Sequence, residues 1–209
     1  MMSVSTAKTG QHDAYWSQRL FACLAEMATY DTNAVLLALA GVNVVETERR
    51  YPDDGLMFAN NRWRAFYHCH EAASQHQNEH GHFHIFTDIG GDQWAHVAAL
   101  AIDIYGQPLY WFAVNRWVTD GPWLSHKQFI HQLRTSAEDE QDALLGRWLY
   151  ALLQLYQAEI SDLFKSRDER VRSYTKKLEL VSVLERQEIY TLATKEIGLQ
   201  AMLEKHLLR

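Results

Sequence analysis

The sequence predicts an α+β fold in which an antiparallel meander sheet of about four strands is covered by N- and C-terminal helices. Three observations favour this class. Apolar residues recur at helical spacing at both ends of the 209-residue chain, four stretches between them read as strands, and the strands are joined by short connections. Short connections favour antiparallel neighbours, because a parallel crossover needs about a dozen residues or more.

The N-terminal part of the chain is predicted to be helical. An apolar stripe at helical spacing runs through residues 13–39, and residues 34–40 belong to a second helix that ends at Gly41. The stripe includes Trp16, Leu20, Leu24 and Met27. Residues 51–55, with the sequence Tyr-Pro-Asp-Asp-Gly, are predicted as a turn, because proline fixes one backbone dihedral and glycine permits a positive one.

Four strands are predicted in the middle of the chain. Their residues are rich in aromatic and β-branched types and are separated by turns that contain glycine. The predicted strands are residues 63–70, 82–88, 94–105 and 109–118. Residues 95–102 are apolar at nearly every position, which predicts a central strand with helices covering both of its faces.

The C-terminal part is again predicted to be helical. Ser125 is a candidate cap for a helix through residue 134, and residues 139–167 show a long apolar periodicity. From residue 168 the charges alternate around a narrow apolar seam, which is typical of one or two exposed helices. We therefore expect two units, a histidine-rich α+β domain over 1–167 and a helical extension over 168–209 that mediates homo-oligomerisation.

Composition narrows the classes of partner. The net charge of −6 gives no basic surface for phosphate binding, so we expect no nucleic-acid partner. The N-terminus lacks the zones of a signal peptide and no apolar run is long enough to span a membrane, which predicts a cytoplasmic protein with no membrane partner. Two separated cysteines, Cys23 and Cys69, exclude a four-thiolate zinc site, so a metal would be held by nitrogen and oxygen.

Seven of the eleven histidines lie between residues 68 and 96, and in two places a pair of them is separated by a single residue. On a strand, residues i and i+2 share a face, so His68 with His70 and His82 with His84 each form a two-pronged fork. Adjacent strands lie about 4.8 Å apart, close enough for both forks to bind one ion. The predicted metal ligands are His68, His70, His82, His84 and His96, with His96 either a fifth ligand or a partner that orients one.

Two residues directly before the second fork, Glu79 and His80, are the predicted catalytic residues. Glu79 could ligate the ion, orient a ligating ring or act as a base toward a metal-bound water. A donor set of four or five nitrogens suits zinc, iron, copper or nickel and disfavours magnesium and calcium. Iron or zinc is the expected cofactor.

The sequence allows two other interpretations of the histidines. His76, His80 and His84 are spaced four apart and would share one face if this segment were a helix. Alternatively, histidines on a sheet face would be hydrogen-bonded polar residues of a wet cleft or a proton-sensitive cluster. His76 by itself, in a segment rich in Gln and Asn, is predicted to be a surface residue.

A candidate substrate-binding group follows the last predicted strand. Polar side chains that end an aromatic strand can hold a carboxylate, a phosphate or an amide, and arginine favours bidentate oxyanion binding. The predicted substrate-binding residues are Asn115, Arg116, Trp117 and Thr119. A structural role for Arg116, paired with Asp120 or a helix C-terminus, is the alternative.

These segments, in this order, resemble an uncharacterised bacterial family, one of the domains of unknown function. The resemblance rests on the motifs Tyr-His-Cys-His at 67–70, Glu-His-Gly-His-Phe-His-Ile-Phe at 79–86 and Asn-Arg-Trp-Val-Thr at 115–119, together with His96. It covers roughly residues 44–167, so the helices after residue 168 are expected to lie beyond the family's usual end. The resemblance implies that these motif residues matter to the family, and it implies no activity.

The leading hypothesis is a mononuclear, histidine-ligated metalloenzyme that acts on a small molecule. Its chemistry would be oxygen activation at non-haem iron or hydrolysis at zinc, with Glu79 assisting proton transfer and Arg116 anchoring the substrate. The alternative is a non-catalytic module that binds a metal, haem or another ligand and assembles through its C-terminal helices. Haem is the less favoured cofactor, since the chain has no Cys-x-x-Cys-His motif.

Overall fold

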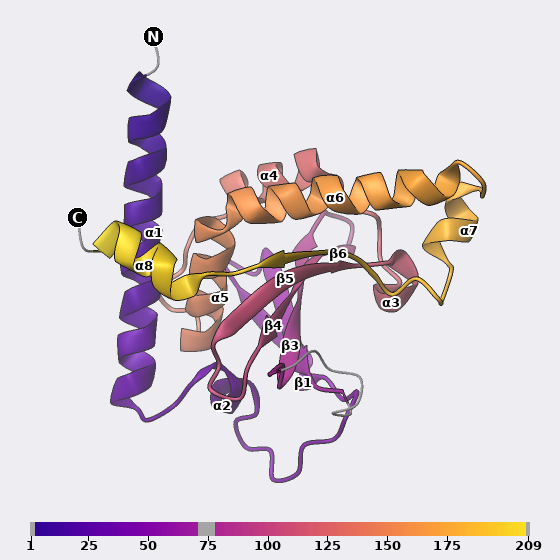
Figure 1. Cartoon of the computed structure of the whole chain (residues 1–209). Coiled ribbons are helices and arrows are strands. Elements are labelled where there is room, and N and C mark those ends of the chain that lie inside the picture. The colour runs from indigo at the N-terminus through magenta and orange to yellow at the C-terminus, as the bar shows by residue number, and fades with distance from the viewer. Residues whose placement is uncertain (1–2, 71–77, 208–209) are drawn as a thin grey trace.

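The computed structural model of the chain describes residues 3–70 and 78–207 (Figure 1). Within these residues, six strands form one antiparallel sheet in the order β1-β2-β3-β4-β5-β6. The strands are β1 (Tyr51–Phe58), β2 (Trp63–His68), β3 (Gly81–Asp88), β4 (Trp94–Ile102), β5 (Pro108–Val114) and β6 (Thr191–Glu196). The predicted meander is therefore confirmed, and it has two more strands than expected.

Helices flank the sheet at both ends of the chain. They are α1 (Ser3–Thr29), α2 (Ala34–Ala38), α3 (Arg116–Thr119), α4 (His126–Thr135), α5 (Leu144–Leu155), α6 (Gln157–Thr175), α7 (Leu180–Leu184) and α8 (Leu199–Leu207). Helices α1 and α5 pack beside each other, α6 runs along the top of the view with α4 behind it, and α8 lies against α1 (Figure 1). The predicted α+β arrangement, with helices from both ends packed on the sheet, is confirmed.

The main core lies between these helices and one face of the sheet. Side chains that alternate along the central strands point into it, including Phe83, Ile85, Leu100 and Trp111. Trp148 of α5 packs against Phe83, with ring centroids 6.1 Å apart. Burial of such aromatic side chains is the largest single source of stability in a core of this kind.

The opposite face of the sheet has a different character. It carries a small cluster of Ala99, Ala101, Tyr110, Phe112 and Val114, next to the alternating histidines of β2 and β3. The expectation that helices cover both faces of β4 is therefore wrong for the part of the chain that the structure describes. Side chains of α1, α5 and α6 belong to the core on one face, and the histidines occupy the other.

The two strands that the sequence did not predict are the edges of the sheet. The turn predicted over residues 51–55 is wrong, because β1 begins at Tyr51 and contains Pro52. Proline is tolerated in an edge strand, where one row of backbone groups needs no partner. β6 lies in the segment expected to be helical throughout, and it pairs along β5 from Thr191 to Glu196. The segment from residue 168 is thus the end of α6, then α7, β6 and α8, rather than helices alone.

The end of β5 and several helix boundaries also differ from the prediction. Strand pairing stops at Val114 because Asn115 caps α3, its side-chain oxygen accepting a hydrogen bond from the Arg116 N–H at 3.0 Å. The predicted helix over 139–167 is divided at Tyr156 into α5 and α6. The helix predicted after Ser125 is α4, and its capping box is complete, with Gln128 as the reciprocal partner.

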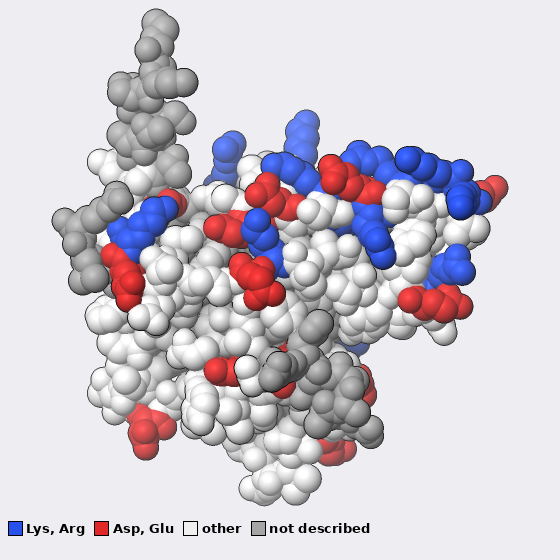
Figure 2. All heavy atoms as spheres, viewed as in Figure 1, with Lys and Arg blue, Asp and Glu red and all other residues white. Residues whose placement is uncertain are grey.

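Charged side chains are distributed unevenly over the helices. Lys and Arg gather along α6 with acidic residues between them, whereas the rest of the visible face is mostly uncharged (Figure 2). Within the described residues, each helix is too short or too polar to cross a bilayer.

Candidate metal centre

Strand pairing brings the two predicted histidine forks together. In the β2–β3 ladder His68 lies directly opposite His82, and Phe66 lies opposite His84, so the three imidazoles project from the same face. The strand interpretation of 82–88 is confirmed, and the helical alternative for this segment is wrong. His76 lies outside the described residues.

Three of the histidines form a compact buried triad. The Nε2 atoms of His68 and His82 are 2.8 Å apart, and one donor nitrogen from each of His68, His82 and His84 lies within 4.8 Å of the others. His82 and His84 are each 2% exposed and His68 is 8% exposed. These side chains could hold a metal ion.

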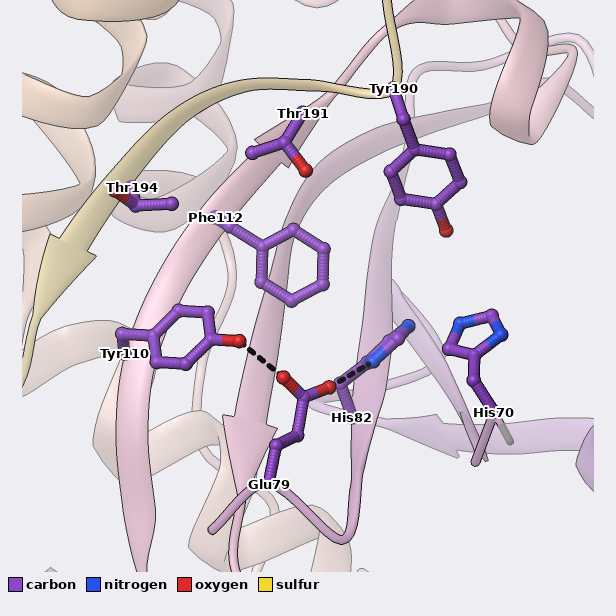
Figure 3. A pocket seen from close by; sticks show the side chains of 8 residues that line it. All are labelled: His70, Glu79, His82, Tyr110, Phe112, Tyr190, Thr191 and Thr194. Carbon is purple, nitrogen blue, oxygen red and sulfur yellow. Dashed lines mark hydrogen bonds and ion pairs between the residues drawn. The ribbon is translucent and has the colours of Figure 1, made fainter. Parts of the chain in front are cut away.

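A buried carboxylate fixes the orientation of His82. The Nδ1–H of His82 donates a hydrogen bond to Glu79 Oε1 at 2.8 Å, and the Tyr110 hydroxyl donates to the other oxygen of the same carboxylate (Figure 3). Because Nδ1 carries the proton, Nε2 of His82 carries the lone pair that a metal needs. The Glu79 side chain is only 5% exposed, which strengthens these charge-assisted bonds.

The other two rings have different neighbours on their Nδ1 sides. His84 Nδ1 lies 3.0 Å from Nε2 of His96, and His68 Nδ1 lies 4.0 Å from a carboxylate oxygen of Glu48. A neighbouring imidazole therefore contacts His84 on its Nδ1 side, whereas the separation of His68 Nδ1 from Glu48 is too long for a hydrogen bond. Partners of this kind set the tautomer and the ring orientation in histidine metal sites.

Burial keeps the imidazoles neutral. It lowers the pKa of His68 to about 3, with a further contribution from the neighbouring His82. Burial also holds the pKa of His84 well below its usual value, and it lowers the pKa of His82 although Glu79 acts in the opposite direction. Neutral imidazole is the form that binds metal, so at pH 7 the triad is in its ligand form.

The spacing of the donors fits a transition-metal ion. Two nitrogens each about 2.1 Å from one ion lie about 3.0–3.4 Å apart at coordination angles of about 90–109°. The His68 and His82 Nε2 atoms, at 2.8 Å, need to separate by only a few tenths of an ångström. An all-imidazole donor set suits iron, zinc, copper or nickel rather than magnesium or calcium.

Small residues around the triad make room for it. Ala99 and Ala101 of β4 lie opposite His84 and His82, so β4 places only small side chains at these two positions. At Gly81 an added Cβ would lie 2.6 Å from the His68 carbonyl oxygen and would overlap the Tyr67 hydroxyl. Glycine therefore allows β2 and β3 to approach each other directly beside the histidines.

Two cavities meet at the histidines. The smaller one, about 260 Å³, is lined by His70 and His82 together with Glu79, and also by Tyr110, Phe112, Tyr190, Thr191 and Thr194 (Figure 3). The larger one, about 520 Å³, borders His68, His70 and His84 and continues along β2 and β3. The two share His70 and Tyr190, and each is lined by at least one residue of the triad.

His70 and Glu48 form a second group at the mouth of the site. The two side chains are hydrogen-bonded through His70 Nδ1, and together with His68 they offer three donor atoms within 4.8 Å of one another. His70 follows the end of β2 and is less buried than the triad. His96 is in neither donor group of the described residues, and its ring lies against His84.

The four predicted substrate-binding residues are divided by the fold. Trp117 and Thr119 line the larger cavity. Asn115 is buried and donates to the Val183 carbonyl oxygen at 2.9 Å, and Arg116 is paired with Glu185. These two lie outside both cavities and connect β5 and α3 to α7.

The predicted catalytic residues also differ in position. Glu79 lies in the site, where it holds His82 and Tyr110. His80 accepts a hydrogen bond from the Tyr67 hydroxyl at 2.6 Å and lines neither cavity. Their catalytic roles stay predictions.

Sequence reasoning missed Glu48, Tyr110 and Tyr190. Glu48 comes from the loop before β1, where its N–H donates to the Cys69 carbonyl oxygen at 3.0 Å and holds the loop between the two histidines of the first fork. Tyr190 precedes β6, and its hydroxyl points toward the histidines (Figure 3). No spacing in the sequence links these residues to the forks, because each reaches the site from a distant segment.

A family model matches most of the chain, from residue 14 to residue 197, and its description is "Domain of unknown function (DUF6969)". The chain belongs to the DUF6969 family. The expectation that the family resemblance stops near residue 167 is wrong, since the DUF6969 region includes β6 and Tyr190. No curated protein and no solved structure matches the chain.

Proposed function

We propose that this protein is a metal-dependent enzyme in which His68, His82 and His84 bind one iron or zinc ion and a small molecule reacts beside it. The observation that carries this proposal is the triad itself. Three neutral, buried imidazoles converge from two strands, and Glu79 and His96 contact the Nδ1 atoms of His82 and His84.

Access to the triad favours a catalytic site over a structural one. Structural zinc sites are usually closed by four protein ligands, whereas catalytic sites keep three protein ligands and an open position. Here three ligands border cavities of about 260 and 520 Å³. The larger volume is in the range of pockets that bind small molecules.

The bound metal would supply oxygen activation if it is iron, or an activated water if it is zinc. Glu79 acts as a positioning residue in this proposal, because its two oxygens hold His82 and Tyr110. His70, hydrogen-bonded to Glu48 and facing both cavities, is placed to move a proton to or from the substrate.

Tyr190 is a second group for proton handling or substrate orientation. It lines both cavities, and its ring packs edge-on against Trp117 at 5.7 Å. Burial raises the pKa of Tyr190 to about 12, with the negative charges of Glu48 and Glu79 adding to the effect. The phenol is therefore a hydrogen-bond donor at pH 7 rather than a phenolate.

Metal analysis of the purified protein tests the proposal. The protein is prepared without a histidine tag, stripped with chelator and reloaded separately with Fe(II) and Zn(II), and its metal content is measured by plasma mass spectrometry. We expect about one ion per chain in the wild type and less than about a tenth of that in His82→Gln and His84→Gln, since each variant loses a nitrogen donor.

His131→Ala serves as the matched control, because His131 is exposed on α4 and lines neither cavity of the site. Its metal content should equal that of the wild type. A wild-type protein that stays free of stoichiometric metal after both reloading steps, or triad variants that retain it, would contradict the proposal.

A further inference from the structure

The larger cavity contains two arginines that the metal site itself does not require. Arg50 lies just before β1 and Arg64 lies on β2, and both line the cavity that borders His68 and His84. The chain as a whole is negatively charged, so a pair of cations in one hollow beside a candidate metal centre is a local exception.

These two guanidinium groups have no carboxylate partner among the residues that the structure describes. The arginines that do pair with a carboxylate are Arg19, Arg49, Arg116, Arg147, Arg167 and Arg186. Glu48, the acidic residue of the same cavity, is engaged with His70. The described wall of the cavity therefore carries two guanidinium groups against the single carboxylate of Glu48, and that carboxylate bonds His70 rather than either arginine.

The two cations also lie close enough to repel each other. Burial lowers the pKa of Arg64, and the positive charge of Arg50 lowers it further. An anion placed between the arginines would relieve this repulsion and accept hydrogen bonds from both.

Aromatic rings hold the guanidinium groups over the cavity. The Arg50 guanidinium lies 4.6 Å from the centroid of the Phe66 ring, and that of Arg64 lies 4.7 Å from Trp94 and 5.7 Å from Phe86. Stacking of this kind reduces the freedom of the long side chains while leaving their N–H groups available. Both arginines are therefore preorganised for a ligand.

The remaining wall is suited to an apolar body. Phe66, Phe86, Trp117 and Val118 line the same cavity, and Phe66 lies between the arginine side and the triad, with its ring centroid 5.4 Å from that of His84. A ligand whose anionic group lies at Arg50 and Arg64 would place its apolar part along these rings and reach His68 and His84.

We propose that the substrate is a small organic anion, a carboxylate or a phosphate ester on an apolar or aromatic body, and that Arg50 and Arg64 bind its anionic group. This inference rests on the proposed function, because it assigns the substrate class of the same site. Arg50 and Arg64 determine specificity, in place of the predicted Arg116, which is paired with Glu185.

The experiment measures the binding of three probes by ligand-observed NMR titration. Benzoate and phenyl phosphate carry the two candidate anionic groups, and benzamide is the neutral control of the same shape. We expect both anions to bind at least about tenfold more tightly than benzamide, and the double variant Arg50→Gln/Arg64→Gln to weaken anion binding at least about tenfold. The tighter of the two anions identifies the anionic group.

Arg49→Gln is the matched control, because Arg49 neighbours Arg50 in sequence but is exposed and paired with Glu46 and Asp53. It should bind the anions as the wild type does. Equal binding of benzoate and benzamide, no binding of either anion, or unchanged anion binding in the double variant would overturn the inference.

Each titration is repeated on chelator-treated protein, and the metal content of every variant is measured. Arginine-dependent anion binding that persists in a protein unable to hold metal would leave this inference standing while the proposed function fails. Normal metal content in the double variant, together with anion binding that does not depend on the arginines, would overturn this inference and leave the proposed function standing. The two failures are thus separable.

Discussion

Glu79→Gln tests whether the metal centre depends on the residue that orients His82. Glutamine has nearly the size of glutamate and keeps one acceptor oxygen for the His82 Nδ1–H, which now bonds Glu79 at 2.8 Å. Its amide N–H₂ would face Tyr110, whose hydroxyl oxygen can accept a hydrogen bond as well as donate one. The variant therefore keeps the shape of the site and removes its buried negative charge.

The expected loss follows from this contact. Removing the partner of a metal-binding histidine typically weakens metal affinity by about 10–100-fold, which corresponds to about 1.4–2.7 kcal/mol. Glu79→Ala should cost more, because both acceptor oxygens disappear. The His82 Nδ1–H, in a ring only 2% exposed, would then lose its bond at a further cost of about 1–3 kcal/mol in folding stability.

Affinity is measured by competition with a chromophoric chelator, and stability by urea unfolding of the metal-free proteins. Glu169→Gln is the control, since Glu169 is exposed on α6 and lines neither cavity. A metal dissociation constant within about threefold of the wild type in both Glu79 variants would refute the reasoning, because the carboxylate would then have no influence on the ligand it contacts.

Two further predictions concern pH and assembly. As the pH falls from 8 to 5, the metal-free protein should lose about 2 kcal/mol of unfolding free energy through His68 alone, measured by urea unfolding. The pKa of His68 is about 3 in the folded state and about 6.5 in the unfolded state, so only the unfolded state gains a proton in this window. We also expect a concentration-dependent dimer in sedimentation velocity, and Leu180→Glu/Val181→Glu should abolish it, because these side chains are 53% and 65% exposed on α7.

The two measurements have distinct controls. Stability that is unchanged from pH 8 to pH 5 would contradict a neutral His68, and His131→Ala, which alters an exposed histidine, should leave the profile of the wild type intact. For assembly, Ser182→Glu introduces a charge on the same helix without removing an apolar contact. A wild-type protein that stays monomeric at high concentration would remove the reason for assigning α7 this role.

The sheet was predictable where local pattern and tertiary environment agree. β2 to β5 carry enough aromatic and β-branched residues to be recognised, and the apolar run of β4 matches its central place. The edge strands were not predictable, because β1 contains Pro52 and β6 has charged residues at Lys195 and Glu196. Their pairing with β2 and β5 stabilises them, and pairing is not a local property.

The triad was predictable for a related reason. Alternation within one strand determines which side chains share a face, so His82 with His84 could be read directly from the sequence. The register of β2 against β3, which sets His68 opposite His82, required the fold. The pairing of Arg50 with Arg64 in one cavity wall could also be seen only in the fold, since Arg50 lies in a loop and Arg64 on a strand.

The segment after residue 167 bears on both the site and the question of assembly. β6 pairs along β5, whose Phe112 packs edge-on against His82 at 4.9 Å, and Tyr190 lines both cavities just before β6 begins. Deleting this segment would expose the backbone of β5 and remove a wall of the site together with any assembly surface. A test of self-association must therefore keep the chain intact and change only side chains on α7, because only then does a lost dimer report on the interface rather than on the sheet.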